Sequence, residues 1–232
     1  KEEFLPIVDT ALVIVARTPR LGEVKTRLAA SLGPVVTLQL YQAFLADLAQ
    51  RFASADAWML HWAYTPGPGD FARELARLVP GVCTDSCFPQ QGPDFASRLH
   101  QIFAETGARA FARTIVISSD SPQVSTALIA QARAALETAD VVLGPAEDGG
   151  YYLIAMREPY DLFTGIPMST DQVLRLTIER ARALSLAVYL LDPLFDVDEE
   201  DDFWRLAHVL ERDPSLAPTT AACIAQVIKE LV

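Results

Sequence analysis

The sequence predicts an α/β protein with a largely parallel sheet that helices cover on both faces. Apolar segments of strand length alternate along the chain with segments that carry apolar residues at helical spacing. The strand-length segments are apolar throughout, as in residues 11–16, which is typical of strands buried on both faces. The chain has 232 residues, 51% of them hydrophobic, so we expect residues 1–232 to form a single domain around one sizeable core.

Each expected strand is a run of mostly apolar or β-branched residues, bounded by turn residues. The strands are expected over residues 7–16, 58–64, 114–118, 141–143, 151–156 and 187–191. A cluster of prolines and glycines over residues 65–69 predicts a turn after the second strand.

Helices are expected where apolar residues recur three or four positions apart, as Leu40, Phe44 and Leu48 do. The expected helices cover residues 36–52, 70–78, 95–106, 125–136, 170–184, 200–210 and 217–231. Ser169, with Gln172 three residues later, predicts a capping box at the start of helix 170–184.

The composition excludes several classes of protein. The chain carries 30 acidic and 19 basic residues, a net charge of −11, whereas nucleic-acid binding needs a basic face. No apolar run approaches the roughly 20 residues that a membrane helix needs. The three cysteines, an odd number, favour reduced thiols in a cytoplasmic protein. We therefore expect neither a nucleic-acid partner nor a membrane span.

Basic side chains gather in the loop after the first strand. Arg17 begins this loop, and Lys25 and Arg27 flank Thr26 shortly after Gly22. Lysine offers a point charge and arginine a planar fork, and both suit phosphate oxygens. We expect Arg17, Lys25 and Arg27 to bind phosphate; the alternative is a solvated loop that pairs with the acidic surface. Neither a dinucleotide-binding glycine motif nor a Walker lysine is present, which argues against nicotinamide dehydrogenases and P-loop kinases.

Two acidic segments follow strands in the middle of the chain. Asp120, braced by Ser119, ends the strand 114–118 and is a candidate ligand of Mg²⁺ or Mn²⁺. Ser119 is itself a candidate phosphate-binding residue. The alternative is that Asp120 or Ser121 caps the next helix. Asp148 precedes two glycines, which permit a close approach of the main chain to a ligand, although Asp-Gly is also common in ordinary hairpin turns; these glycines are Gly149 and Gly150.

A third acidic segment contains Asp196 and Asp198, whose side chains point to the same side of an extended main chain. Two carboxylates about 4 Å apart repel by roughly 4 kcal/mol at an effective dielectric near 20, and a bound cation removes that repulsion. The alternative is an acidic helix start, which the helix dipole favours.

All these segments follow predicted strands, and open α/β sheets bind ligands beyond the carboxyl ends of their strands. The sequence therefore predicts one site where the cations meet the carboxylates. Phosphate and a divalent metal would lie between them.

The same segments resemble a known family. The order of motifs is Pro19…Gly22-x-Val24-Lys25-Thr26-Arg27-Leu28, Asp120-x-Pro122, Asp148-Gly149-Gly150-Tyr151-Tyr152-Leu153-Ile154 and Asp196-Val197-Asp198…Asp202. This order resembles DUF2064, an uncharacterised bacterial family of glycosyltransferase-like, nucleotide-diphospho-sugar transferases, over nearly the whole chain. The family is similar in fold to GT-A glycosyltransferases. It is also similar to the nucleotidyltransferases that guanylylate phospholactate or join GTP to molybdopterin.

The resemblance implies a three-layer α/β/α nucleotide-binding domain. Lys25 and Arg27 match the family's phosphate-binding positions, and Asp120 its usual metal position. Asp198, together with Asp196, matches a second acidic position near the metal. Three residues depart from the family pattern: Ser118 stands in place of Gly, Glu199 in place of Thr, and Arg17 where Lys is common.

Three functions remain open from the sequence. The first is a metal-dependent transferase that takes a nucleotide-diphospho-sugar donor and a small-molecule acceptor, with Asp148 facing the acceptor as a base. The second is a nucleotidyltransferase that joins an NTP to a phosphorylated or alcohol acceptor and releases pyrophosphate. The third is a nucleotide-binding module without activity. The departures from the family pattern at Ser118 and Glu199 favour this third function.

Overall fold

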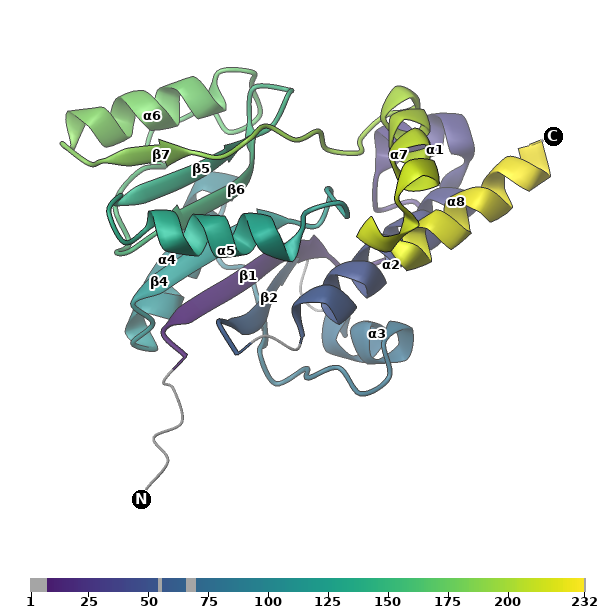
Figure 1. Ribbon diagram of the computed structural model, residues 1–232, viewed down its shortest axis with the longest axis horizontal. Helices are drawn as coiled ribbons and strands as arrows, with labels where there is room; N and C mark the ends of the chain where they lie inside the picture. The colour runs from purple at the N-terminus through teal and green to yellow at the C-terminus, as the bar shows by residue number, and fades with distance from the viewer. Residues whose placement is uncertain (1–7, 54–55, 66–69, 232) are drawn as a thin grey trace.

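The structure is a computed structural model that describes residues 8–53, 56–65 and 70–231. A seven-stranded sheet runs through the molecule in the order β3-β2-β1-β4-β6-β5-β7 (Figure 1). The strands are β1 (Thr10–Arg17), β2 (Met59–Thr65), β3 (Cys87–Pro89), β4 (Arg113–Ser118), β5 (Val141–Pro145), β6 (Tyr151–Met156) and β7 (Val188–Leu190). All neighbouring strands pair in parallel except for β6, which runs antiparallel to β4 and β5. The expected mostly parallel sheet is confirmed, and the antiparallel strand β6 was not expected.

Eight α-helices and one 3₁₀ turn are assigned within the described residues. They are α1 (Thr26–Leu32), α2 (Pro34–Phe52), α3 (Phe71–Leu78), α4 (Phe95–Ala108), α5 (Thr126–Ala135), α6 (Val173–Ala183), α7 (Glu200–Arg212), η1 (Pro214–Leu216) and α8 (Pro218–Leu231). In Figure 1, α1, α7 and α8 gather beyond the carboxyl ends of β1 and β4, where α1 and α8 each contact α7.

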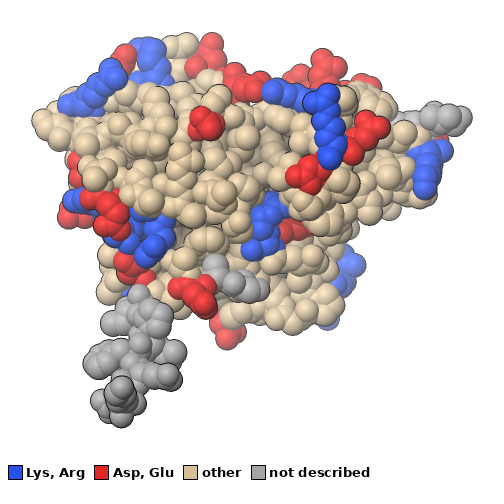
Figure 2. Space-filling model, in the orientation of Figure 1, with Lys and Arg blue, Asp and Glu red and all other residues tan. Residues whose placement is uncertain are grey.

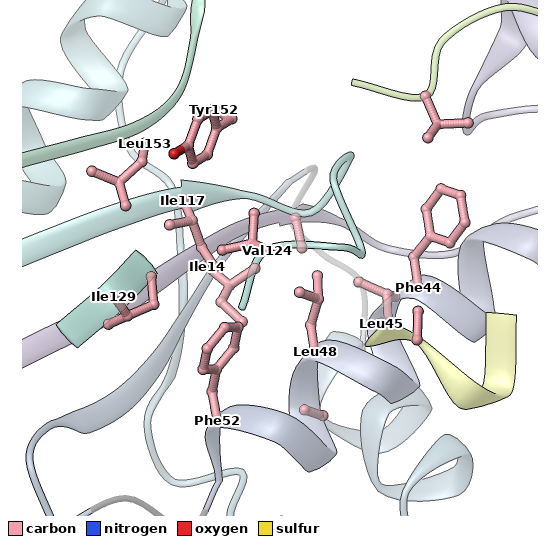
Figure 3. Packing of buried hydrophobic residues seen from close by; sticks show 14 of the residues in the cluster. Ile14, Phe44, Leu45, Leu48, Phe52, Ile117, Val124, Ile129, Tyr152 and Leu153 are labelled. Carbon is pink, nitrogen blue, oxygen red and sulfur yellow. The ribbon is translucent and has the colours of Figure 1, made fainter. Parts of the chain in front are cut away.

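Side chains that alternate along the strands build two cores, one on each face of the sheet. Leu12 and Ile14 of β1 belong to the larger core, which α2, α5 and α7 cover. Ala11 and Val13 face the other way, into a smaller core under α4 and α6. Figure 3 shows the larger core, in which Leu48 and Phe52 of α2 point toward the strands. Because the strands are apolar on both sides, helices must cover both faces, which gives the expected three layers.

The expected elements recur with small shifts in their ends. The first strand begins at Thr10, and Ile7, where it was expected to begin, lies outside the described residues, as does most of the predicted turn 65–69. The strand β3 was not expected, because it has only three residues and ends in a proline.

The predicted capping box of Ser169 and Gln172 is wrong. The helix α6 begins later, with Gln172 itself at the N-cap and no side-chain cap. The Thr170 hydroxyl accepts the main-chain N–H of Gln172 at 3.4 Å, so this segment forms a turn before the helix. The helix α7 has a capping box instead, made by Glu199 and Asp202.

Two further expectations can be compared with the described residues. None of their helices is both long and apolar enough to cross a membrane. The three cysteines, Cys83, Cys87 and Cys223, form no disulfide and are free.

Candidate active site

A cavity of about 490 Å³ lies at the carboxyl ends of β1 and β4. Its walls include the loop after β1, the ends of β2 and β4, the starts of α4 and β6, and the segment before α7. Six of the predicted site residues line it, namely Arg17, Lys25, Arg27, Ser119, Asp120 and Asp198. The parallel strands β1 and β4 end at the same edge of the sheet, so segments far apart in the sequence meet there. Of the expected contacts between early cations and late carboxylates, the structure contains those of Lys25 with Asp120 and Asp198, whereas Asp148 and Asp196 do not line the cavity.

Lys25 lies at the centre of this arrangement. Its ammonium nitrogen, Nζ, lies 2.6 Å from Oδ1 of Asp120 and 2.8 Å from Oδ1 of Asp198. The lysine side chain is 6% exposed, whereas the Asp120 and Asp198 side chains are 39% and 44% exposed. The cation is therefore buried beneath two carboxylates that still reach solvent.

The electrostatics at Lys25 follow from this geometry. Burial alone would lower the pKa of Lys25, but the charges of Asp120 and Asp198 outweigh burial and hold the pKa above its usual value. The main chain of Lys25 is left-handed, with φ of 47°, a conformation that is unfavourable for a residue with a side chain. Its carbonyl accepts the N–H of Ala29 at 2.8 Å, which fixes the main chain to the first turn of α1. The protein thus retains a strained conformation at the residue that carries the central cation.

Asp120 is placed by main-chain contacts at the end of β4. Its N–H donates to the Ser118 hydroxyl at 3.0 Å, and the N–H of Ser119 donates to the Val15 carbonyl at 3.1 Å. The alternative role of Asp120 as a helix cap is wrong, because Ser125 caps α5 with its own side chain.

Asp196 has a different environment from Asp198. Its carboxylate accepts the hydroxyl of Ser121, and it is not among the residues that line the cavity. Burial raises the pKa of Asp196 to about 6 against the effect of this hydrogen bond, and the nearby charges of Asp120 and Asp148 add to the rise. The hydrogen bond joins Asp196 to Ser121, the residue after Asp120, and the expected role of Asp196 as a metal ligand stays a prediction.

Two residues that sequence reasoning missed hold the site in place. The Tyr41 hydroxyl lies 3.0 Å from the Ser119 hydroxyl, and it accepts the N–H of Arg17 at 2.8 Å. Arg51 donates from Nη1 to the carbonyls of Pro122 and Val124, at 2.6 and 2.7 Å. Both residues lie on α2 among apolar positions, where nothing in the sequence distinguishes them from core or surface residues.

The outer cations are more exposed. Arg17 is exposed and donates from Nη1 to the Glu23 carbonyl at 3.1 Å. The Arg27 side chain is 74% exposed, and its Nη1 lies 3.7 Å from Oε1 of Glu199. In Figure 2, side chains of both charges lie together over α1 and α7.

The structure does not bring Asp148, Gly149 or Gly150 to the lining of the cavity. They form the turn of an antiparallel hairpin between β5 and β6, and Oδ1 of Asp148 accepts the N–H of Gly150 at 2.9 Å. Gly149 packs against the main chain of Asp171, where a Cβ would lie 2.1 Å from the carbonyl oxygen. This geometry explains Asp148 and the two glycines as parts of a packed turn, and their expected roles toward ligands stay predictions.

Residues 44–170, more than half of the chain, match the family model described as an uncharacterized protein conserved in bacteria, DUF2064. The chain belongs to the DUF2064 family. The matched range of this DUF2064 protein includes Asp120 and the Asp148 turn, whereas Lys25 and Asp198 lie outside it.

Solved structures extend the similarity of this DUF2064 protein to almost its whole length. A protein from Desulfovibrio desulfuricans G20, named as a candidate nucleotide-diphospho-sugar transferase, is 28% identical with a TM-score of 0.84. The match covers 95% of this chain and 99% of that one. The expected transferase class agrees with this similarity. No functionally curated protein matches the chain.

More distant structures share the fold alone. The 4-diphosphocytidyl-2C-methyl-D-erythritol synthase of Anaerococcus prevotii DSM 20548 has a TM-score of 0.54 at 8% identity, over 88% of this chain and 99% of that one. A cytidylyltransferase from Leptospira borgpetersenii serovar Hardjo-bovis has a TM-score of 0.51 at 14% identity, over 90% of this chain and 97% of that one.

The donor set of this DUF2064 protein can be tested for a divalent metal. Within the described residues, no group of three or more His, Cys, Asp or Glu side chains is arranged to hold a metal ion. Asp120 and Asp198 nevertheless converge on a single cation, the Lys25 ammonium. Mg²⁺ is usually held by one or two carboxylates together with substrate phosphates. The residues therefore fit a metal that is shared with a phosphate ligand, and they do not form a closed metal cage.

Proposed function

We propose that this protein is a metal-dependent transferase that uses a nucleotide-diphospho-sugar donor and a small-molecule acceptor. The observation that carries the proposal is the contact of Lys25 with both Asp120 and Asp198 inside a cavity that Arg17 and Arg27 also line. Such a mixture of cations and carboxylates suits a diphosphate with an associated metal. The similarity over nearly the full length to the Desulfovibrio protein supports the same choice of donor.

The proposed roles follow from the positions of the side chains. Lys25, Arg17 and Arg27 would bind the diphosphate and neutralise charge that develops on it as it leaves. Asp120 and Asp198 would hold Mg²⁺ or Mn²⁺, which supplies further charge neutralisation at the leaving diphosphate. Asp148 is exposed in the hairpin turn, where one of its oxygens already accepts an N–H. As a base toward the acceptor it would act through its other oxygen.

A nucleotidyltransferase is the second candidate, because the Leptospira and Anaerococcus structures share the fold. In that reaction the same cations would bind a triphosphate, and pyrophosphate would leave. The loop between β1 and α1 favours the first candidate. It covers residues 18–25 and contains a single glycine, Gly22, whereas many sugar-nucleotide pyrophosphorylases have a long glycine-rich loop at this point.

The first experiment measures thermal unfolding with a panel of NTPs, NDPs and nucleotide sugars, each with and without Mn²⁺. A ligand at 100 times its Kd adds about 2.7 kcal/mol, which raises the Tm of a domain of this size by roughly 5–11 °C. Asp120→Asn is expected to remove the Mn²⁺-dependent part of the shift. Asp85→Asn, the same change at an exposed residue away from the cavity lining, is expected to keep it. An unchanged shift in Asp120→Asn would refute the metal assignment.

The products then separate the candidates. Incubation of the bound donor with a broad acceptor panel should release a nucleoside diphosphate if the protein transfers a sugar. Release of pyrophosphate from an NTP would establish the nucleotidyltransferase instead. Tight binding without either product across the panel would favour the binding module.

A further inference from the structure

The cation between Asp120 and Asp198 belongs to the protein itself. The Lys25 ammonium has three N–H groups. Two of them point at Oδ1 of Asp120 and Oδ1 of Asp198, at 2.6 and 2.8 Å. The lysine side chain is almost fully buried. The position that a divalent metal would take between these two oxygens is therefore already filled by a positive charge.

We propose that Lys25 is a positioning residue, an internal counter-ion that holds the Asp120–Asp198 pair together until phosphates of the nucleotide draw it away. As a consequence, the divalent metal and the nucleotide bind as a pair, and each binds weakly alone. This inference rests on the proposed function, because it assumes that the site takes a phosphate and a metal.

A divalent metal and Lys25 compete for the same carboxylate oxygens. A metal that arrives without a nucleotide must take oxygens that Lys25 already holds, and it must sit beside the buried ammonium. The metal ion and the Lys25 ammonium are both positive, and two neighbouring positive charges repel strongly in a site that is partly shielded from water. The metal therefore meets both an occupied donor set and an unfavourable charge.

Lys25 can release the two carboxylates. Its carbonyl is bound to the N–H of Ala29, so the main chain stays with α1. The four-carbon side chain is flexible, however, and its ammonium can change partners while the main chain stays in place. A phosphate in the cavity offers a new counter-charge to Lys25, and Arg17 and Arg27 line the same cavity.

The binding of metal and the binding of phosphate are thereby linked. Once the ammonium has moved to the phosphate, the carboxylates of Asp120 and Asp198 are free for the metal. If phosphate favours metal binding, the metal must favour phosphate binding by the same factor. Lys25 thus makes the two ligands cooperative without any movement of a domain.

The test uses Mn²⁺ alone, and the EPR signal of free Mn²⁺ reports the bound fraction. Lys25→Met removes the internal cation, and we expect this variant to bind Mn²⁺ at least tenfold more tightly than the wild type. Arg27→Met is the matched control, because Arg27 lines the same cavity but pairs with Glu199 instead of the aspartate pair. We expect its Mn²⁺ affinity to lie within threefold of the wild-type value. An affinity in Lys25→Met that equals or falls below that of the wild type overturns the proposal.

A second variant guards against a loss of folding, since bare carboxylates destabilise the site. Lys25→Gln is neutral and keeps an amide that can donate to one carboxylate, and the same gain in Mn²⁺ affinity is expected. Circular dichroism establishes that each variant is folded before the titration.

A second measurement uses the wild type with ADP, GDP, CDP and UDP. For any of these that binds, the thermal shift with Mn²⁺ should exceed the sum of the two separate shifts, and an additive shift contradicts the proposal. The two proposals fail separately. If no nucleotide binds but Lys25→Met gains Mn²⁺ affinity, the counter-ion role stands and the proposed function falls. If nucleotides bind with Mn²⁺ but Lys25→Met matches the wild type, the function stands and the counter-ion role falls.

Discussion

The main-chain N–H of Val197 donates a 3.0 Å hydrogen bond to the carbonyl of Asp120. This bond joins the segment that carries Asp198 to the segment at the end of β4. Gln123 adds a second bond, from its amide nitrogen Nε2 to the Phe195 carbonyl at 2.7 Å. Both bonds join the segment 195–198 to the segment 120–123, and we call this contact the junction. The separation of the Asp120 and Asp198 carboxylates therefore depends on the junction as much as on the aspartates themselves.

Gln123→Ala tests the junction. Gln123 is 7% exposed, and its loss would leave the Phe195 carbonyl with the longer 3.5 Å bond from the Ser121 hydroxyl. The net loss of one hydrogen bond costs about 0.5–1.5 kcal/mol of the free energy of unfolding. We expect a fall in Tm of several degrees, measured by calorimetry, and a smaller Mn²⁺-dependent nucleotide shift. Gln131→Ala is the control, because Gln131 is exposed on α5 and its amide donates to the Tyr189 hydroxyl at 3.3 Å rather than to the site segments. Equal effects of the two substitutions would argue against the junction.

The sequence predicts the meeting of Lys25 with Asp120 and Asp198, because strand ends can be located from apolar runs. Parallel strands then carry their carboxyl ends to a shared edge. The sequence does not predict that Tyr41 contacts the site, because its partners Arg17 and Ser119 belong to two different strand ends. The contacts of such a residue depend on how the layers pack, and no local pattern encodes them.

A local signal failed at one point and left two explanations open at another. Ser169 fits the pattern of an N-cap, but the chain makes a turn through Thr170 before α6 begins. The Asp-Gly-Gly turn fits both a ligand loop and a hairpin, and in the structure it joins antiparallel strands. Both patterns describe a few residues and carry no information on what packs against them.

His61 predicts a pH dependence of stability. It lies in β2, is 2% exposed and stacks edge-on against Phe111 at 5.4 Å. Burial lowers its pKa to about 4, and the charge of Arg109 adds to the decrease. In the unfolded chain His61 is protonated near pH 6.5, whereas in the folded protein it stays neutral until the pH approaches 4. The free energy of unfolding therefore falls as the pH drops from 6.5 toward 4.

The size of this effect can be measured by urea unfolding at pH 7.5 and 5.0. The pKa difference predicts a loss of about 2 kcal/mol between these values from His61. Between pH 7.5 and 5.0, the free energy of unfolding of His61→Leu should therefore fall by about 2 kcal/mol less than that of the wild type. His208→Leu, at a side chain that is 61% exposed on α7, should keep the wild-type loss. A His61→Leu protein with the wild-type pH dependence would contradict the assignment.

Gly149→Ala distinguishes the two explanations of the hairpin turn. Gly149 has φ of 90°, and an added Cβ would lie 2.1 Å from the carbonyl oxygen of Asp171. Gly165→Ala is the matched control, because Gly165 also has a positive φ, 78°, but an added Cβ would meet nothing within 4 Å. The control should lose about 1–2 kcal/mol from main-chain strain alone. Gly149→Ala should lose clearly more in the same chemical denaturation assay, because a strand turn or the segment before α6 must move. If the two variants are equally stable and only Gly149→Ala binds nucleotide more weakly, then Gly149 serves the ligand rather than the packing of the turn.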